Sequence, residues 1–518
     1  MTHEASRQRH GKSSLEREFA ESTSLHGIAK VFHASRLLIR FVWVAIMLTC
    51  LCVCVWQISD RFHRFLQYKA NTEISVEYTR DLDFPAVTIC NFNRYRSSAL
   101  TESDKTYLPY IIWANDYDYD SFGDSQGGVE YWDVVADDGR DNDTHFNYTD
   151  FTLRAGFLMD DITLRQCEWR RKTKSCSPAN FSHVFTSFGN CWTFNSGKTG
   201  PILKETQAGS GNGVRMLIDI QQSEYTETVD GNIPAGLKVL IHDQATPPFV
   251  ESSGLAISPG VYAFIGVRKQ QYLNLEHPYG KCNASKTLTR FSHYTREGCK
   301  IECRARAILE KCNCRLVRHP GNETECSPQQ TSGCAMSTLG ALVGGEDNPC
   351  DCPVPCNYTT FTTSLSTASI PSNSVAAHLQ GLTETSYSSD YSYSSFSVPY
   401  PAQLDLFEEG YIPKNVILLD VFYEDINFER YEQSEAITPS ALISDIGGQL
   451  GLFLGASFIT LAEILSYFGK KIDFWIQRGL GKHRRLLERQ RDNRHGRDVP
   501  LKSVRIDNGN HRTLWADV

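Results

Sequence analysis

The sequence predicts a mixed α/β membrane protein: two transmembrane helices with a large, disulfide-rich α+β domain between them. Three observations support this fold class. Two long apolar segments lie towards opposite ends of the chain, positive charge gathers outside those segments, and most cysteines lie between them. The chain has 518 residues, which is enough for more than one ordinary domain.

The first apolar segment, residues 41–59, contains no charged residue. At a rise of about 1.5 Å per residue, a helix of this length can cross a hydrocarbon core of about 30 Å. It is preceded by 40 residues, and no cleavage pattern of small residues follows it. We therefore expect a retained signal anchor, with a cytoplasmic segment at 1–40 and a transmembrane helix at 41–59.

The second apolar segment, residues 446–468, carries a single charge, Glu463. A buried helix of a soluble protein can be this apolar, but it is rarely this long and apolar on every face. We therefore expect a second transmembrane helix at 445–468. Two core helices of a soluble protein are the alternative.

Net charge differs between the parts of the chain. Residues 1–40 carry +3 and residues 469–518 carry +7, and subtracting both from the whole-chain −8 leaves −18 for residues 41–468. Basic residues next to a membrane span stay in the cytoplasm. We therefore expect a multi-pass protein of the plasma membrane, with both termini cytoplasmic and residues 60–444 outside.

The cysteines support the same topology. Of 17 cysteines, Cys50, Cys52 and Cys54 lie in the first segment, and the other 14 all lie between the two segments. This distribution is typical of disulfides formed in an oxidising compartment. Zinc is the alternative, but structural zinc sites favour paired Cys-x₂₋₄-Cys ligands in a reducing compartment. N-glycosylation sequons also occur only between the segments: Asn142, Asn147, Asn180, Asn283, Asn322 and Asn357.

The extracellular Cys-rich domain, 60–444, is large enough to have its own core. Residues rich in β-branched and aromatic side chains predict strands at 84–91 and 415–423, next to the two spans, and further strands at 214–220 and 237–242.

A helix is predicted at 295–311, where Cys299 and Cys303 would lie one turn apart on one face. A Ser/Tyr-rich insertion at 383–401 is given no role. The cytoplasmic basic tail, 469–518, is expected to be disordered after Arg478 or to rest on anionic lipid.

Polar side chains recur at helical spacing along the second apolar segment. On one continuous helix a single stripe would contain Asp445, Gln449, Phe453, Ala456, Thr460 and Glu463. Polar groups within a membrane face a water-filled path or a partner helix. The stripe therefore fits a pore lined by several copies, in which carboxylate rings would favour cations. Helix packing with one glutamate near the interface explains it equally well.

Six motifs occur in order along residues 22–475. They are His26-Gly27, FPAVTICN at 84–91, GNCWTFNSG at 189–197, GSGNG at 209–213, CDCPVPCNYT at the end of the cysteine-rich block, and GGQLGLFLGAS at 447–457. In sequence and order these motifs resemble those of the degenerin/epithelial sodium channel family. Within that family the chain resembles the acid-sensing and bile-acid-sensitive branch.

The resemblance implies a trimeric, amiloride-sensitive, sodium-selective cation channel without enzymatic activity or cofactor. Its partners would be copies of itself or family subunits, membrane lipid, and an extracellular ligand or protons, but no nucleic acid. The resemblance also implies roles for individual residues. Gly455, Ala456 and Ser457 would form a selectivity filter, an extended segment that interrupts the helix, and the pore lining would include Asp445, Gln449, Thr460 and Glu463. Gating would involve His26 and Gly27, which lie close beneath the filter in the family, together with Ser444, Tyr68 and Tyr279.

The family's disulfide pattern, carried onto this sequence, uses all 14 cysteines outside the first span. Sequence alone could not have chosen among so many pairings. The implied pairs are Cys90–Cys191, Cys167–Cys176, Cys282–Cys356, Cys299–Cys352, Cys303–Cys350, Cys312–Cys334 and Cys314–Cys326.

The gating stimulus is less determined by the resemblance. In acid-sensing relatives, paired carboxylates with raised pKa values bind protons. Candidate proton-sensing carboxylates here are Asp420, Glu424, Glu429 and Asp230. Other expected sensor positions are occupied by Met336, Gly340, Lys69, Ala70 and Gln207. We therefore expect either weak proton gating or gating by another ligand, such as a bile-acid-like amphiphile or a peptide. A solvated acidic surface is the alternative for the carboxylates.

Other functional classes fit less well. A two-pass receptor without a pore explains the topology and the disulfides but not the polar stripe or the GAS motif at 455–457. The sequence contains no HExxH, GxSxG or P-loop motif, which argues against the common enzyme classes. Juxtamembrane charge accounts for the basic tails better than nucleic-acid binding does.

Overall fold

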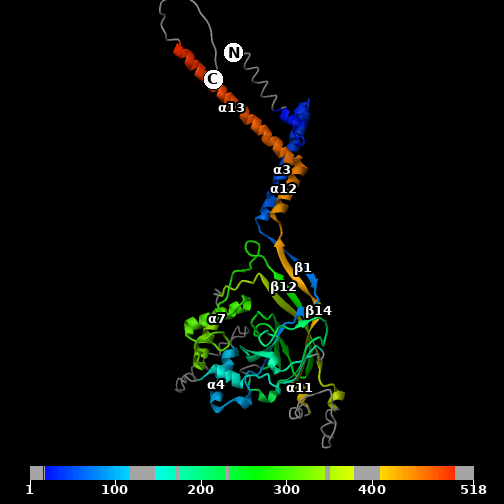
Figure 1. The fold of residues 1–518 in the computed structure, drawn as a ribbon, viewed down its shortest axis with the longest axis vertical. Coiled ribbons are helices and arrows are strands. Elements are labelled where there is room, and N and C mark those ends of the chain that lie inside the picture. The colour runs from blue at the N-terminus through cyan, green and yellow to red at the C-terminus, as the bar shows by residue number, and fades with distance from the viewer. Residues whose placement is uncertain are drawn as a thin grey trace, which may run out of the picture. The chain divides into compact units, whose positions relative to one another are not determined.

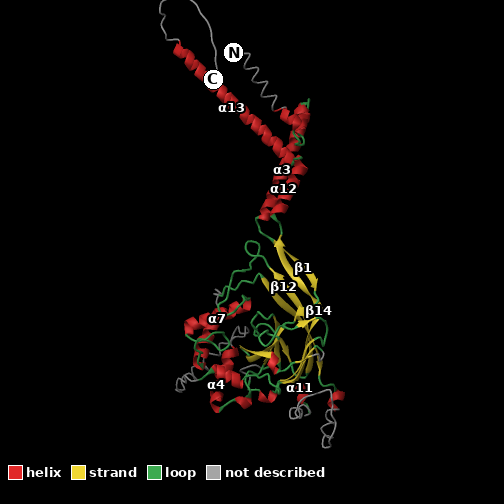
Figure 2. Cartoon of the chain, viewed as in Figure 1, coloured by secondary structure: helices red, strands yellow, loops and turns green. Residues whose placement is uncertain are grey.

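The structure, a computed structural model, describes residues 16, 18–116, 146–170, 174–227, 233–344, 350–377 and 409–495. The chain divides into two compact units. The larger unit is formed by residues 70–435, and the smaller unit is formed by residues 1–69 together with 436–518. All described strands belong to the larger unit, whereas the described elements of the smaller unit are all helices (Figure 2).

The larger unit contains two main β-sheets. In spatial order, the first is formed by β13 (Asn357–Ser369), β12 (Val261–Leu273), β14 (Val416–Glu435), β9 (Gly213–Asp219), β4 (Leu164–Trp169) and β5 (Lys174–Ser175), with β1 (Ala70–Tyr78) paired to β14. The second is formed by β11 (Leu255–Ile257), β10 (Leu237–His242), β3 (Ala86–Asn91), β7 (Gly189–Phe194) and β6 (Phe181–Thr186). A short pair joins β2 (Leu82–Asp83) to β8 (Lys204–Glu205).

Strand β14 organises the first sheet. Its first part pairs antiparallel with β9 from Val416 to Phe422, and its second part pairs antiparallel with β1 from Asn427 to Glu435. Along its other edge it runs parallel to β12 (Figure 1). Three strands from distant parts of the sequence are therefore held in register by this one strand.

The main core lies between the two sheets. All six residues of β3 are buried, as expected for a strand covered on both faces. Phe84 makes edge-to-face contacts with Trp169 and Tyr423 at centroid distances of 4.8 and 5.9 Å. A buried ion pair, Arg165 Nη2 to Asp219 Oδ2 at 2.9 Å, joins β4 to β9.

The helices of the larger unit are α4 (Glu102–Asp116), α6 (Tyr148–Ala155), α7 (Arg296–Cys312), α8 (Pro328–Gln330), α9 (Met336–Gly344) and α11 (Tyr411–Asn415). Helix α7 confirms the helix predicted at 295–311. It begins where the Thr295 hydroxyl accepts a hydrogen bond from the Gly298 N–H at 3.1 Å, and it ends at Asn313, whose φ is 54°.

Seven disulfides stabilise the larger unit. They close separations of 9 to 101 residues and so restrict the unfolded chain. Cys299 and Cys303, one turn apart on α7, both bond to one neighbouring segment through Cys352 and Cys350. The pairs are those that the family pattern implies: Cys90–Cys191, Cys167–Cys176, Cys282–Cys356, Cys299–Cys352, Cys303–Cys350, Cys312–Cys334 and Cys314–Cys326. Cys50, Cys52 and Cys54 are free.

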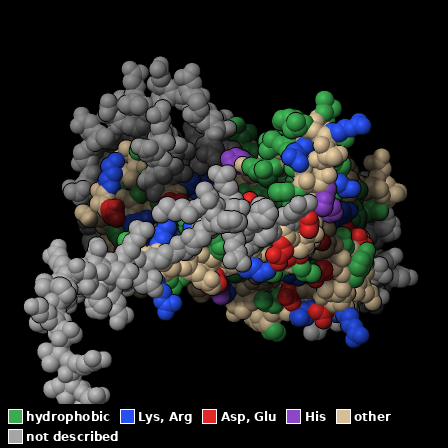
Figure 3. Space-filling model, turned by 90° about the horizontal axis from the view of Figure 1, so that it is seen from above, with side chains coloured by type: hydrophobic (Ala, Val, Ile, Leu, Met, Phe, Trp, Pro, Cys, Tyr) green, Lys and Arg blue, Asp and Glu red, His purple; other side chains and the backbone are tan. Residues whose placement is uncertain are grey.

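The smaller unit contains α2 (Ile28–His33), α3 (Leu37–Phe65), α12 (Pro439–Leu454) and α13 (Phe458–His495), and α3 packs beside α12 (Figure 1). Helix α3 is long and apolar enough to cross a membrane and extends beyond the predicted 41–59 at both ends. Helices α12 and α13 meet the same test only as a pair, bent by 73° at the break between them. A view of the whole molecule from above shows hydrophobic, Lys/Arg and Asp/Glu side chains interspersed on its described surface (Figure 3).

Two expectations were wrong. The strand next to the first span is β1, whereas the strand predicted at 84–91 is a buried central strand of the second sheet. In β1, Ile74, Val76 and Tyr78 alternate with polar residues, a period-two pattern typical of a strand, and all three side chains are exposed. Of the two alternatives for the tail, disorder directly after Arg478 was wrong, because α13 continues to His495 through residues rich in Leu, Arg and Lys, which favour helix.

Candidate functional site

The second apolar segment is interrupted at residues 455–457, between α12 and α13. Gly455 has φ of 63°, a left-handed conformation that glycine adopts at little cost. The N–H groups of Gly455 and Ala456 donate to the carbonyls of Gly451 at 3.0 Å and Leu450 at 3.2 Å. The last turn of α12 is therefore closed by the glycine that follows it.

Ser457 starts the next helix. The Thr460 N–H donates to the Ser457 hydroxyl at 3.3 Å, and the Ser457 N–H donates to the Thr460 hydroxyl at 3.0 Å. This reciprocal pair has the arrangement of a capping box. A glycine stop signal and a serine start signal, two residues apart, thus produce the bend of 73°.

The break agrees with the interrupted helix that the resemblance implies, and it rules out the polar stripe expected on one continuous helix. Asp445, Gln449 and Phe453 lie on α12, Ala456 lies in the break, and Thr460 and Glu463 lie on α13. A spacing argument assumes constant helical rotation, which Gly455 ends.

The segment before α2 fits against this break. The His26 N–H donates to the Leu454 carbonyl at 3.0 Å. A Cβ added at Gly455 would lie 1.5 Å from His26 Nδ1, so the imidazole fills the space where a side chain would stand. Gly27, with φ of 87°, packs closely against α3, because a Cβ added at Gly27 would lie 2.4 Å from Met47 Sδ. His26 therefore contacts the end of α12, and Gly27 contacts α3.

A second contact lies one turn into α13. The Ser24 N–H donates to Glu463 Oε2 at 2.9 Å, and the Ser24 hydroxyl is hydrogen-bonded to the Thr460 hydroxyl. Thr460 is fully buried. Both of these predicted pore-lining side chains thus contact the chain's own N-terminal segment. Ser24 and Met47 were not anticipated, since a serine or methionine outside a motif gives no sequence signal.

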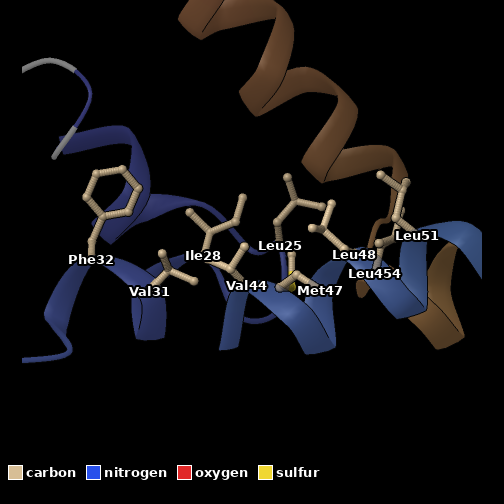
Figure 4. A pocket seen from close by; sticks show the side chains of 9 residues that line it. All are labelled: Leu25, Ile28, Val31, Phe32, Val44, Met47, Leu48, Leu51 and Leu454. Atoms are coloured by element: carbon tan, nitrogen blue, oxygen red, sulfur yellow. The ribbon is translucent and has the colours of Figure 1, made fainter. Parts of the chain in front are cut away.

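An apolar groove of about 460 Å³ lies between α2, α3 and the end of α12 (Figure 4). Its walls are Leu25, Ile28, Val31, Phe32, Val44, Met47, Leu48, Leu51 and Leu454. The groove continues the surface on which the N-terminal segment packs.

On α12, Asp445 forms an ion pair with Arg61 of α3 at 3.8 Å. Ser444, the residue before it, is exposed. Gln449 differs from both, because its Oε1 atom is buried and has no hydrogen-bond partner among the described residues. An unsatisfied amide oxygen in an apolar segment is costly.

Three of the four candidate proton-sensing carboxylates lie on β14. Asp420 is fully buried in the first sheet. It accepts hydrogen bonds from the Ser210 hydroxyl at 2.6 Å and the Gly211 N–H at 3.0 Å, and Arg215 lies 3.6 Å away. The GSGNG loop therefore surrounds this carboxylate with donors.

Glu424 and Glu429 are also paired. A hydrogen bond from the Ser364 hydroxyl and an ion pair with Arg268 lower the pKa of Glu424 from its ordinary value. Hydrogen bonds from Tyr431 at 2.8 Å and Gln270 at 2.9 Å lower the pKa of Glu429. Both shifts are opposite to the raised pKa expected of a proton sensor.

The other predicted residues lie in both units. Tyr68, with φ of 48°, follows α3 in the smaller unit, and Tyr279 belongs to the larger unit. Met336 is buried on α9 beside the disulfide cluster. Asp230 lies outside the described residues, as does Asn142. Among the described sequon asparagines, Asn283 is half-buried, and the exposed ones are Asn147, Asn180, Asn322 and Asn357.

The family model described as "Amiloride-sensitive sodium channel" matches residues 19–467, which include both membrane-type helices, the N-terminal segment and the disulfide-rich unit. The chain belongs to the amiloride-sensitive sodium channel family. This confirms the resemblance drawn from the motifs. Because the family consists of channels, it also confirms the expectation that the chain is not an enzyme.

Individual relatives of this family member are acid-sensing channels. Acid-sensing ion channel 1C of Danio rerio is 34% identical over 459 residues, covering 87% of this chain and 82% of the relative. Acid-sensing ion channel 2 of Homo sapiens is 34% identical over 474 residues, covering 90% and 88%. A solved proton-activated chloride channel aligns with 84% of this chain and 96% of its own length at 6% identity, but its TM-score of 0.28 is too low to indicate a shared fold.

The contact between Ser24 and Thr460 gives a direct test of how the N-terminal segment docks. In full-length protein with Cys50, Cys52 and Cys54 replaced by alanine, we expect Ser24→Cys and Thr460→Cys to form a disulfide under mild oxidation. The loss of two maleimide-reactive thiols would report it. The matched control is Ser22→Cys with Thr460→Cys, since the Ser22 hydroxyl bonds only locally, to the Phe19 carbonyl. Equal cross-linking of the two pairs, or none of either, would contradict the docking.

Proposed function

We propose that this chain is a subunit of a trimeric, amiloride-sensitive, sodium-selective and ligand-gated cation channel of the plasma membrane. The observation that carries the proposal is the break at residues 455–457, seated on His26, within a chain of the sodium channel family. An interrupted helix exposes backbone carbonyls that can replace part of an ion's hydration shell. We assign the selectivity filter to Gly455, Ala456 and Ser457.

The proposed topology follows the charge pattern of the sequence. Residues 41–59 and 445–468 cross the membrane, 60–444 face the outside, and both tails are cytoplasmic. The unpartnered Gln449 oxygen supports assembly with further copies, because a neighbouring subunit or pore water could hydrogen-bond to it. Asp445 and Glu463, repeated in three subunits, would give the pore its preference for cations.

Replacing Gly455 tests the filter. We expect Gly455→Ala to abolish the sodium current or to lower sodium-over-potassium selectivity by about tenfold, because the added methyl group displaces His26 and opposes a positive φ. The measurement is the whole-cell reversal potential with external sodium replaced by potassium, with and without amiloride.

Gly469→Ala is the matched control, since nothing lies within 4 Å of its added Cβ. It should retain the wild-type current and selectivity. Unchanged selectivity in Gly455→Ala at equal surface expression would remove this residue from the filter. If wild type and both variants reached the cell surface without any current, the alternative of a two-pass receptor without a pore would gain support.

A second candidate concerns the stimulus. The lowered pKa values of Glu424 and Glu429 favour a channel that responds to an extracellular ligand, such as an amphiphile or a peptide, over one that senses protons through these groups. The names of the acid-sensing relatives favour proton gating. We propose that any acid response of this chain arises from groups other than these two.

The pH dependence follows from the direction of the shifts. A lowered pKa means that ionised Glu424 and Glu429 stabilise the described conformation. That stabilisation is fully present above the ordinary pKa of 4.5 and is lost only as the pH falls through the lowered values. A step from pH 7.4 to 5 lies above this window.

We therefore expect Glu424→Gln and Glu429→Gln, singly and together, to leave the pH of half-maximal current within about 0.2 units of wild type. Amiloride-blocked current in pH steps between 7.4 and 5 would measure it. Loss of an acid-evoked current in the double variant, at normal surface expression, would show instead that these carboxylates are the sensor.

A further inference from the structure

Helix α13 continues well beyond the predicted membrane span, which ends at Phe468, and it keeps an apolar face. Its large apolar side chains are each 53–64% exposed. They are Leu465, Phe468, Ile472, Trp475, Ile476, Leu480 and Leu486. The spacing between them, mostly three or four residues, gathers them on one side of the helix.

The remaining surface of this segment is basic. Residues 469–486 contain six Lys/Arg and one acidic residue, Asp473, which gives a net charge of +5. At about 100° of rotation per residue, Lys471, Arg478 and Lys482 border one side of the apolar face, and Arg484 borders the other. Trp475 lies on the apolar face close to this basic border, a combination found where helices meet the polar region of a bilayer.

The segment is held within the described part of the chain only at its start, where Lys470 forms an ion pair with Glu18 at 3.6 Å and Lys471 donates to the Tyr467 hydroxyl at 3.2 Å. Beyond Lys471, the side-chain contact recorded among described residues is the bond from Gln477 to Asp473 at 3.0 Å. Three positions, Gly469, Gly479 and Gly481, carry glycine, a poor helix former, with nothing within 4 Å of an added Cβ. Because helices in proteins depend mainly on packing of their apolar face, this segment requires a surface outside the described chain.

The position of this segment narrows the choice of that surface. It continues α13 directly from the proposed second span, which ends at Phe468, so it begins at the membrane boundary. A helix that starts there, with an apolar face and basic borders, matches an interfacial membrane helix.

We propose that the segment of α13 from Lys470 to Leu486 lies on an anionic lipid surface, at the leaflet from which the two basic tails emerge. Its apolar face enters the boundary between headgroups and acyl chains, and Lys471, Arg478 and Lys482 contact lipid phosphates and carboxylates. A bundle of the same segment from several copies is disfavoured, because each copy would bring a charge of +5 without acidic partners at the flanking positions.

The test uses full-length protein, with Cys50, Cys52 and Cys54 replaced by alanine, reconstituted into vesicles of phosphatidylcholine alone or with 30% phosphatidylserine. A nitrobenzoxadiazole label is attached at Ile476→Cys, on the apolar face, or at Gln477→Cys, on the polar face. We expect nitroxide-labelled lipid to quench the label at 476 about twofold more than at 477, and the difference to be larger with phosphatidylserine. Neither position belongs to the proposed filter, so the result is independent of ion conduction.

Each other outcome has a defined meaning. Equal, water-like emission and weak quenching at both positions would overturn the proposal. So would a disulfide between copies at Ile476→Cys, which would indicate a helical bundle. A further variant, with Lys471, Arg478 and Lys482 replaced by glutamine, should lose the phosphatidylserine dependence while keeping the elution volume of wild type. If it kept that dependence, the basic borders would not contact lipid as proposed.

Discussion

The arrangement of the smaller unit depends on one backbone constraint, the left-handed conformation of Gly455. It ends α12, and Ser457, two residues later, begins α13, which produces the 73° bend. The absence of a side chain at Gly455 also gives His26 its place, since any Cβ would overlap the imidazole. His26 and Gly27 then contact α12 and α3 respectively, and Ser24 contacts α13. A movement of the N-terminal segment is therefore coupled to the break by packing and by four hydrogen bonds, which gives a physical basis for the proposed gating role.

The arrangement of the larger unit depends on β14, because this strand pairs with strands from three parts of the sequence. The same strand carries Asp420, Glu424 and Glu429. Each carboxylate already has donors. Asp420 has the GSGNG loop and Arg215, and Glu424 has Ser364 and Arg268. Glu429 has Tyr431 and Gln270. Such groups link strands. The pKa values of Glu424 and Glu429 are lowered, so these two would bind protons in the physiological range only in a conformation that separates them from their donors. Their matching positions in the sequence therefore do not establish proton sensing.

The sequence predicted the mixed α/β, disulfide-rich character of the fold, the first long apolar helix, helix α7, strands β9, β10 and β14, and the family, because these depend on composition, periodicity and ordered motifs. It did not predict β1, although Ile74, Val76 and Tyr78 alternate with polar residues there, or the helical part of the tail, where Gly479 and Gly481 weaken the helix signal of the Leu, Arg and Lys residues. The single polar stripe was wrong because spacing assumes an unbroken helix. The contacts of Ser24 with Thr460 and Glu463 span more than 430 positions in the sequence, and no local pattern encodes them. Residue types likewise gave the carboxylate positions but not the donors that lower the pKa values of Glu424 and Glu429.

The central claim is that three copies of this chain form a sodium-selective pore at the break. The most direct measurement is single-channel recording of purified full-length protein in a planar bilayer, with sodium and potassium on opposite sides and Ser444 replaced by phenylalanine to favour the open state. The account predicts unit currents with a reversal potential set by sodium, blocked by amiloride, from particles that contain three subunits. Silent bilayers, or currents that do not distinguish sodium from potassium, from monodisperse trimers with intact disulfides would contradict it.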